Sequence, residues 1–250
     1  MPISRITALA ALLTAAPLIS APLTAAASPL DGGRSDAAGH LFGSAPRNED
    51  IPTCRGVPAT HINEDGTADD DVIVVTDPSV SINAWNGDDV ICVSTGHGYG
   101  ATVDGGNGND SIITYSGENF IYGGADNDSI MSNTADHLLD GESGNDNIYI
   151  GQHPDTAVYG GDGNDRILGS PFADTIHAGD DDDLVIGFGG NDTVQGGDGN
   201  DRLEGRAGAD DLDGGPGSDT CVDQAAPATT FTSCETSLGV LFDGGLGFAT

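Results

Sequence analysis

Apolar residues recur at every ninth position through the second half of this chain. Two residues before each of them stands an aspartate, and each aspartate closes a glycine-containing hexapeptide. The aspartates of this series are Asp165, Asp174, Asp183, Asp192, Asp201, Asp210 and Asp219. Their apolar partners are Ile167, Ile176, Val185, Val194, Leu203, Leu212 and Cys221. A fixed spacing over so many units indicates an internal repeat.

The same nine-residue frame extends toward the N-terminus, where aspartate occupies only alternate positions. These earlier aspartates are Asp71, Asp89, Asp110, Asp128 and Asp146. The positions between them hold Val80, Ala101, Asn119, His137 and Thr156, and their apolar partners are Ile82, Val103, Ile121, Leu139 and Val158. The hydrophobic period is therefore nine along the whole array, whereas the carboxylate period changes from about eighteen to nine.

This difference in period predicts the architecture. Each unit consists of a six-residue turn and a three-residue strand, and two units make one coil of eighteen residues. The two strands of a coil lie in opposite parallel sheets, and its two turns lie on opposite edges. The inward apolar residues form a narrow core that becomes stable only when neighbouring coils stack. We predict an all-β solenoid of two parallel sheets.

The stacking places the aspartates in two rows. The first edge carries Asp71, Asp89, Asp110, Asp128, Asp146, Asp165, Asp183, Asp201 and Asp219. The second edge carries Asp174, Asp192 and Asp210. Carboxylates stacked about 5 Å apart repel one another strongly unless a counter-charge lies between them.

The composition favours cations as partners. The formal net charge is −33, so the chain is expected to bind neither nucleic acid nor anionic membranes, and we expect no membrane insertion. Such acidity is also found in disordered chains, but here the acids are periodic rather than clustered in runs. The available ligands are oxygens of Asp, Asn and backbone carbonyls, which suit Ca²⁺ better than Mg²⁺ or zinc. The six histidines show no ligand-like clustering and are interpreted as surface or slot residues.

The two ends of the chain suggest export. Arg5 precedes an apolar stretch that runs to about Ile19, and residues 25–27 form a small-residue cleavage site. The predicted organisation is a signal peptide (1–27), a flexible leader (28–52), an N-terminal cap (53–66), the repeat array (67–223) and a C-terminal cap (224–250).

Four cysteines in an exported chain indicate two disulfides, with three possible connectivities. The favoured pairs are Cys54–Cys92 and Cys221–Cys234, one near each end of the array. Free buried thiols are the alternative.

The repeat resembles the RTX, or hemolysin-type, nonapeptide G-G-x-G-x-D-x-U-x, most closely at 103–113, 159–168 and 196–204. The cysteine-containing flanks look like those of small secreted actinobacterial members. The resemblance implies a parallel β-roll in which each Ca²⁺ lies between turns one coil apart, held by the repeat Asp and by carbonyls of the first four turn residues. The implied carbonyl ligands are Gly105, Gly106, Asn107 and Gly108 beside Asp110; Gly123 and Gly124 beside Asp128; Gly160, Gly161, Asp162 and Gly163 beside Asp165; and Gly196, Gly197, Asp198 and Gly199 beside Asp201.

Four turns depart from that pattern. The turn before Asp71 has Gly66 as its only glycine, Pro216 occupies the third position of the last turn, and Val80 and Ala101 have no ligating side chain.

These observations predict a secreted calcium-binding repeat protein with a structural, surface or matrix role, largely disordered without the ion. The first alternative is an adhesin or ligand-binding module that uses an outer sheet face. The second is a calcium-dependent enzyme. We expect no enzymatic activity, because the chain has no H-E-x-x-H or G-x-S-x-G motif and no room for a catalytic domain outside the array.

Overall fold

The computed structural model describes residues 52–153, 156–223 and 229–239. The predicted signal peptide, residues 28–51 of the leader, and residues 224–228 and 240–250 of the C-terminal segment lie outside the described residues. In the described part, no helix is long and apolar enough to cross a membrane.

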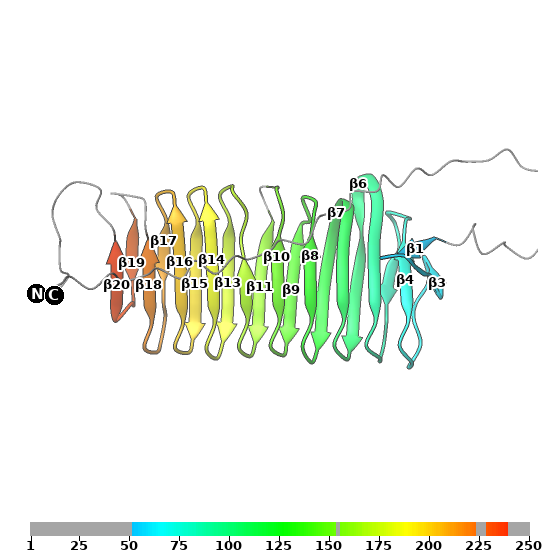
Figure 1. Ribbon diagram of the computed structural model, residues 1–250, viewed down its shortest axis with the longest axis horizontal. Helices are drawn as coiled ribbons and strands as arrows, with labels where there is room; N and C mark the ends of the chain where they lie inside the picture. The colour runs from blue at the N-terminus through cyan, green and yellow to red at the C-terminus, as the bar shows by residue number, and fades with distance from the viewer. Residues whose placement is uncertain (1–51, 154–155, 224–228, 240–250) are drawn as a thin grey trace, which may run out of the picture. The chain divides into compact units, whose positions relative to one another are not determined.

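The described residues form strands that wind into a solenoid (Figure 1). The strands are β1 (Thr53–Cys54), β2 (Val57–Pro58), β3 (His61–Ile62), β4 (Val72–Val75), β5 (Ser81–Asn83), β6 (Val90–Asn107), β7 (Ser111–Ala125), β8 (Ser129–Ser132), β9 (Leu138–Ser143), β10 (Asn147–Ile150), β11 (Ala157–Asp162), β12 (Arg166–Leu168), β13 (Thr175–Asp180), β14 (Leu184–Gly189), β15 (Thr193–Asp198), β16 (Arg202–Ala207), β17 (Asp211–Asp213), β18 (Thr220–Asp223), β19 (Thr230–Thr232) and β20 (Thr236–Gly239).

Most strands pair in parallel with the strand that lies one coil away. Thus β10 pairs with β12, β12 with β14 and β14 with β16 in one sheet, while β11 pairs with β13 and β13 with β15 in the other. The register aligns the apolar residue of each repeat, for example Ile167 with Val185 and Ile176 with Val194. The predicted parallel β-roll is therefore confirmed.

Two ladders of apolar side chains fill the space between the sheets. The first ladder consists of Ile73, Ile91, Ile112, Ile130, Ile148, Ile167, Val185, Leu203 and Cys221, all at most 1% exposed. The second consists of Ile82, Val103, Ile121, Leu139, Val158, Ile176, Val194 and Leu212, all at most 2% exposed. Each complete coil contributes one residue to each ladder, so it depends on its neighbours for burial.

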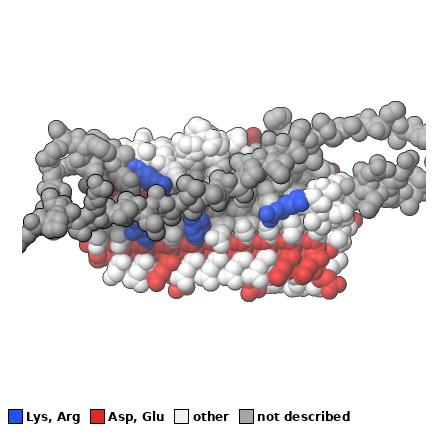
Figure 2. Space-filling model, viewed as in Figure 1, with Lys and Arg blue, Asp and Glu red and all other residues white. Residues whose placement is uncertain are grey.

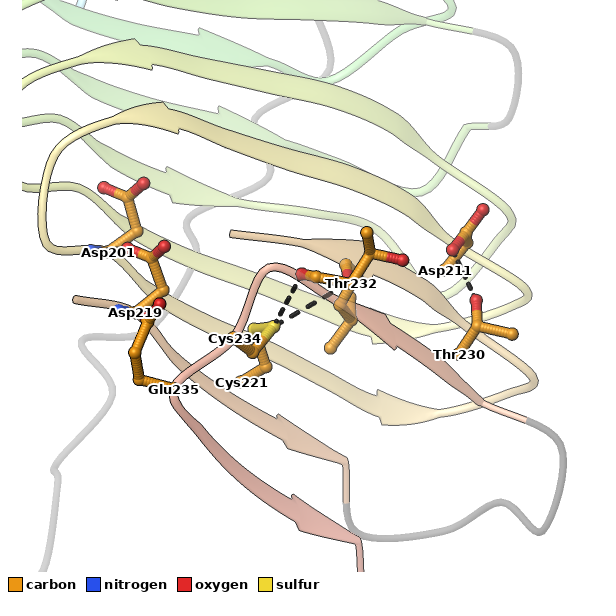
Figure 3. The surroundings of a disulfide bond; sticks show 9 residues. Asp201, Asp211, Asp219, Cys221, Thr230, Thr232, Cys234 and Glu235 are labelled. Atoms are coloured by element: carbon orange, nitrogen blue, oxygen red, sulfur yellow. Dashed lines mark hydrogen bonds between the residues drawn. A yellow bond between two sulfur atoms is a disulfide. The ribbon is translucent and has the colours of Figure 1, made fainter. Parts of the chain in front are cut away.

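A disulfide lies near each end of the described solenoid. Cys54 in the antiparallel hairpin of β1 and β2 is joined to Cys92 in β6, and Cys221 in β18 is joined to Cys234 (Figure 3). This is the pairing favoured by the sequence. The sheets also continue beyond Asp223, where the repeat pattern ends, because β19 pairs with β17 and β20 pairs with β18.

The burial of the core residues predicts how much stability is lost when one of them is shortened. Replacing the buried Ile130 with Ala should lower the free energy of unfolding in saturating calcium by about 2–5 kcal/mol, because a cavity replaces a fully packed side chain. Met131, the next residue, points outward and is 42% exposed, so Met131→Ala should cost much less. Denaturant unfolding of both variants measures the difference, and equal losses would contradict this account of the core.

Candidate metal centre

The repeat aspartates of the first edge form a continuous hydrogen-bonded ladder. The backbone N–H of Asp110 donates to Asp128 Oδ1 at 2.8 Å, and that of Asp128 donates to Asp146 Oδ1 at 2.7 Å. The same bond links every consecutive pair from Asp71 to Asp219. These carboxylates are only 1–6% exposed, so the ladder fixes one oxygen of each side chain inside the turn.

The second oxygen of most of these carboxylates is buried without a partner. Within the described residues, ten Oδ2 atoms make no hydrogen bond. They belong to Asp89, Asp110, Asp128, Asp146, Asp165, Asp183, Asp192, Asp201, Asp210 and Asp219. Buried polar atoms are normally paired, and an unpaired buried charge is costly. Ten equivalent orphaned oxygens, eight in a periodic row on the first edge and two on the second, indicate a common missing partner.

Without a counter-ion these carboxyls resist ionisation. Burial raises the pKa of Asp128 to about 8, and the charges of Asp146 and Asp110 add to that effect. Burial likewise raises the pKa of Asp183 to about 8 and that of Asp165 to about 7, and the charges of neighbouring aspartates raise both values further. The metal-free fold therefore favours protonated aspartates near neutral pH.

Eight of the ten orphaned oxygens face a space that a glycine at the first turn position leaves open, whereas Ala84 and Ala178 stand at that position in the turns of Asp89 and Asp183. A Cβ atom built on Gly123 would lie 2.5 Å from Asp128 Oδ2 and 2.8 Å from the carbonyl oxygen of Gly141, one coil later. Equivalent pairs of oxygens converge on Gly105, Gly160 and Gly196. The sites thus combine a carboxylate from one turn with a carbonyl from the next turn.

At the second turn position of the Asp128 turn, glycine is required by the backbone conformation. Gly124 has φ = +117°, which is favourable only for glycine, and an added Cβ would overlap the carbonyl group of Gly106 in the preceding coil. Backbone of adjacent turns therefore approaches closely along the first edge. The implied carbonyl ligands Gly105, Gly106, Asn107 and Gly108 lie in one turn of this kind, because Gly106 also has positive φ and packs against the backbone of the preceding coil.

The second edge differs from the sequence prediction at one position. The nine-residue frame predicts His137 at the turn position that follows Asn119 on this edge. The structure puts Asp136 there instead, 1% exposed and hydrogen-bonded to the backbone N–H of Asn119. A local irregularity before β9 shifts the slot by one residue. His137 instead lies on the surface beside Glu118, with its Nε2 3.3 Å from Glu118 Oε2.

Two repeat aspartates already have partners for both oxygens. Asp71 accepts hydrogen bonds from Thr60 and Thr67, and its Oδ1 lies 3.2 Å from His61 Nδ1. Asp174 accepts bonds from the backbone N–H and hydroxyl of Ser170. The structure thus separates these two aspartates from the ten with an orphaned oxygen.

The sequence analysis missed a second ladder on the outside of the first edge. The residue before each repeat aspartate, usually Asn or Asp, accepts a bond from the equivalent backbone N–H one coil later, as in Asn127 to Asn109 and Asn145 to Asn127. The bonds continue through Asn164, Asp182 and Asn200 to Ser218. Asn or Asp at this position was visible in the sequence at the same period.

At the C-terminal end other side chains replace the repeat aspartate. The N–H of Asp219 donates to Glu235 Oε2 at 2.5 Å, and the N–H of Asp210 donates to Thr229 Oγ1 at 3.2 Å. Figure 3 shows Asp201, Asp219 and Glu235 in succession beside the Cys221–Cys234 disulfide. The sequence pattern had already ended at these positions, so neither Glu235 nor Thr229 could be assigned from it.

The first edge is also the most acidic surface visible. Exposed acids on its turns include Asp69, Asp70, Asp88, Asp126, Asp162, Asp180, Asp181, Asp182 and Asp198. Figure 2 shows a band of acidic residues along the lower side of the solenoid, where Figure 1 places the turn between β15 and β16. Among residues 52–153, 156–223 and 229–239, no three His, Cys, Asp or Glu side chains are grouped so that they could hold a metal ion. A cation between turns would therefore depend on backbone carbonyls.

A sequence model of the RTX calcium-binding nonapeptide repeat matches the chain in four copies, at residues 65–99, 95–130, 159–187 and 186–221. These matches cover more than half of the chain, and they include nine of the ten turns with an orphaned carboxylate oxygen; the turn of Asp146 lies between the second and third matches. The chain belongs to the RTX calcium-binding repeat family. No curated protein matches its sequence.

The RTX assignment agrees with the chemistry of the turns. RTX nonapeptides are calcium-binding motifs, and the chain is accordingly a calcium-binding repeat protein. The donors seen here are hard oxygens, the class that calcium prefers, and they come from carboxylates and carbonyls. The β-roll of this family is typically a structural or binding element rather than a catalytic one, and RTX repeat proteins are typically extracellular.

The raised pKa values predict a pH dependence for the metal-free chain. Asp128 and Asp183 have folded-state pKa values of about 8, far above the ordinary 3.8, so protonation favours the fold. This stability is fully present below about pH 4 and is lost as the pH rises through about 6 to 8. In chelator, the β-sheet circular dichroism should therefore be stronger at pH 5 than at pH 8. A signal in chelator that is equal or stronger at pH 8 would contradict this prediction.

Proposed function

We propose that this RTX protein is secreted and folds when about ten calcium ions bind between its stacked turns. The observation that supports this most directly is the row of ten buried, unpaired Oδ2 atoms. Eight lie on the first edge and two, from Asp192 and Asp210, lie on the second. The same division follows from counting the gaps between adjacent aspartate turns in the sequence.

The donor set favours calcium over other divalent ions. Candidate sites such as those at Gly105 and Gly123 offer a carboxylate oxygen from one turn and a carbonyl oxygen from the next, without sulfur or imidazole. Ca²⁺ accepts six to eight oxygen ligands in flexible geometry, whereas Mg²⁺ requires a tight octahedron and retains its waters. The turns also lack the His and Cys clusters that zinc prefers.

The protein's own residues set up each site in three ways. The aspartate ladder orients the carboxylate, because its Oδ1 accepts a backbone N–H and leaves Oδ2 directed into the turn. Glycine at the first turn position leaves the space open, as at Gly105 and Gly160. Glycine at the second position brings the adjacent backbone close, as at Gly161 and Gly197. Bound calcium would supply positive charge to the orphaned oxygens.

Binding is then coupled to folding. The unfolded chain has no stacked turns, so calcium binds the folded state and stabilises it by mass action. Ten divalent ions carry twenty positive charges, which offset much of the formal net charge of −33. Extracellular calcium modules commonly have Kd values of about 10⁻⁴–10⁻³ M, which suit a chain that folds only outside the cell.

Two features support export and a structural, surface or matrix role. The apolar N-terminal stretch after Arg5 has the organisation of a secretory signal, and two disulfides are typical of oxidising compartments. A solenoid whose described residues are largely devoted to repeat turns and strands suits a structural role better than a catalytic one.

A second candidate role is ligand binding at the outer surface. A cavity of about 350 Å³ is lined in part by Gly106 and Gly124. Trp85, 54% exposed with φ = +78°, lines it together with the carboxylates of Asp104 and Glu142. An aromatic ring beside two carboxylates suits a guanidinium or ammonium group, so this candidate is a module that binds basic side chains.

The leading proposal predicts a calcium-dependent folding transition. Calcium added to the chelator-treated chain at neutral pH should restore the β-sheet circular dichroism, and calorimetry should count about ten ions, while equimolar Mg²⁺ should do neither. Asp128→Asn should lose one or two ions, because an amide places N–H groups where the cation requires an oxygen. Asp126→Asn, the same change two residues earlier on an exposed side chain, should lose none.

Metal-free protein that is already compact, unfolds cooperatively on heating and gains nothing from calcium would refute the proposal. Equal ion counts for the Asp128 and Asp126 variants would refute the assignment of the ladder carboxylates as ligands.

The second candidate can be tested through intrinsic fluorescence, because Trp85 is the only tryptophan of the chain. In saturating calcium, an arginine-containing peptide should change that fluorescence and its citrulline analogue should not. Glu142→Gln and Asp104→Asn should each weaken binding several-fold, whereas Asp180→Asn, exposed and outside the cavity, should not. Identical responses to the two peptides would exclude a site for basic groups, and a response to oligosaccharides alone would indicate a glycan site.

A further inference from the structure

Three carboxylates of the solenoid are satisfied by hydroxyl groups instead of being left unpaired. They are Asp71, Asp136 and Asp174, and none of their oxygens is among the orphaned atoms of the described residues. In each case a Ser or Thr stands four residues earlier, at the second position of the turn: Thr67, Ser132 and Ser170. The ten turns with an orphaned oxygen have no hydroxyl residue at that position.

The contacts in the first and third of these turns are closely similar. Thr67 donates its backbone N–H to Asp71 Oδ2 at 2.8 Å and its hydroxyl to the same atom at 2.9 Å. Ser170 donates its backbone N–H to Asp174 Oδ2 at 2.7 Å and its hydroxyl to Oδ1 at 2.9 Å. In both turns a backbone donor occupies the oxygen that is unpaired elsewhere.

Asp136 reaches the same result with a different set of donors. The hydroxyls of Ser132 and Thr114 donate to its Oδ2 at 2.7 and 2.6 Å. The side-chain amide of Asn119 donates to its Oδ1 at 2.8 Å. The carboxylate is 1% exposed and has donors at both oxygens.

The backbone conformation of the second turn residue divides the turns in the same way. In all ten turns with an orphaned oxygen this residue has positive φ, from +70° at Glu142 to +131° at Gly179. The ten residues are Trp85, Gly106, Gly124, Glu142, Gly161, Gly179, Phe188, Gly197, Arg206 and Gly215. Thr67, Ser132 and Ser170 are not among the residues with positive φ.

Glycine itself is therefore not what distinguishes the two kinds of turn. Trp85, Glu142, Phe188 and Arg206 stand at the second position with φ between +70° and +78°, and the carboxylates of their turns are orphaned like those of glycine turns. The second residues of the other three turns, Thr67, Ser132 and Ser170, instead carry a hydroxyl group and do not have positive φ.

We propose that a Ser or Thr at the second turn position replaces the calcium ion, so that the Asp71, Asp136 and Asp174 turns close without metal. An N–H or O–H group directs a positive hydrogen at the oxygen that a cation would need, so the donor and the cation compete for the same carboxylate oxygen. This inference rests on the proposed function, because it assigns which carboxylates take ions.

The placement of two of these turns gives the inference a structural consequence. Asp71 is the first repeat aspartate on the first edge, and Asp174 begins the nine-residue aspartate series on the second edge, where Asp136 lies in an earlier coil. Each row therefore begins with a turn whose carboxylate is held by the protein itself. The next aspartate of each row, Asp89 or Asp192, has no hydrogen-bond partner at its Oδ2 and begins the calcium-binding series.

The test is a count of calcium ions by calorimetry and equilibrium dialysis on the full chain. Ser170→Gly should bind one ion more than the wild type, and Ser170→Thr, which retains the hydroxyl, should bind the same number. Arg206→Ser should bind one ion fewer, because Ser can supply both donors to Asp210. Arg206→Gly is the matched control, since it removes the same side chain but retains the left-handed turn.

Thr67→Gly on the first edge should also add one ion, which keeps the test decisive if a second-edge variant does not fold. Unchanged counts in the folded glycine variants, or in Arg206→Ser, would overturn the inference. A wild-type chain that binds no calcium would instead refute the proposed function, so the two failures are distinguishable.

Discussion

The fold depends on how the charge of stacked carboxylates is balanced inside the turns. Each of the ten orphaned aspartates is buried, accepts a backbone N–H of the preceding coil at one oxygen and directs the other into a space lined by carbonyl oxygens. Such an arrangement is unfavourable for a free carboxylate, because burial and the neighbouring charges both oppose ionisation. It becomes favourable when a divalent cation occupies that space. The same atoms that destabilise the metal-free chain therefore make its folding conditional on the ion.

The narrow core explains why this balance is decisive. Each coil places only a few apolar side chains in the core, such as Ile112 and Ile121 from β7, and no coil has a core of its own. Stability in a stack of this kind is a sum of contributions from neighbouring coils. The aspartate ladder and the outer Asn and Asp ladder connect the same coils through hydrogen bonds along the first edge. Disulfides at Cys54–Cys92 and Cys221–Cys234 tie the terminal segments of the described solenoid to it.

Much of this arrangement could be predicted from the sequence, because register in the roll follows directly from period. The nine-residue spacing of residues such as Ile176 and Val185 determined the two core ladders, and the alternation of aspartates determined the two edges. Prediction failed where the period is locally broken: the slot assigned to His137 belongs to Asp136, since the chain shifts by one residue before β9. Glu235 and Thr229 act beyond the last recognisable repeat. The distinction between hydroxyl and orphaned turns depends on φ at residues such as Ser170, which spacing alone does not reveal.

The roll has a direction, because each candidate ion site, or cradle, is completed by a carbonyl oxygen of the coil that follows it in the chain. Asp128 Oδ2 converges with the carbonyl of Gly141, and Asp219 Oδ2 converges with that of Ser233. The two ends are consequently not equivalent with respect to truncation. Removing a coil from the N-terminal side takes away only its own cradle, whereas removing one from the C-terminal side also opens the cradle of the coil before it.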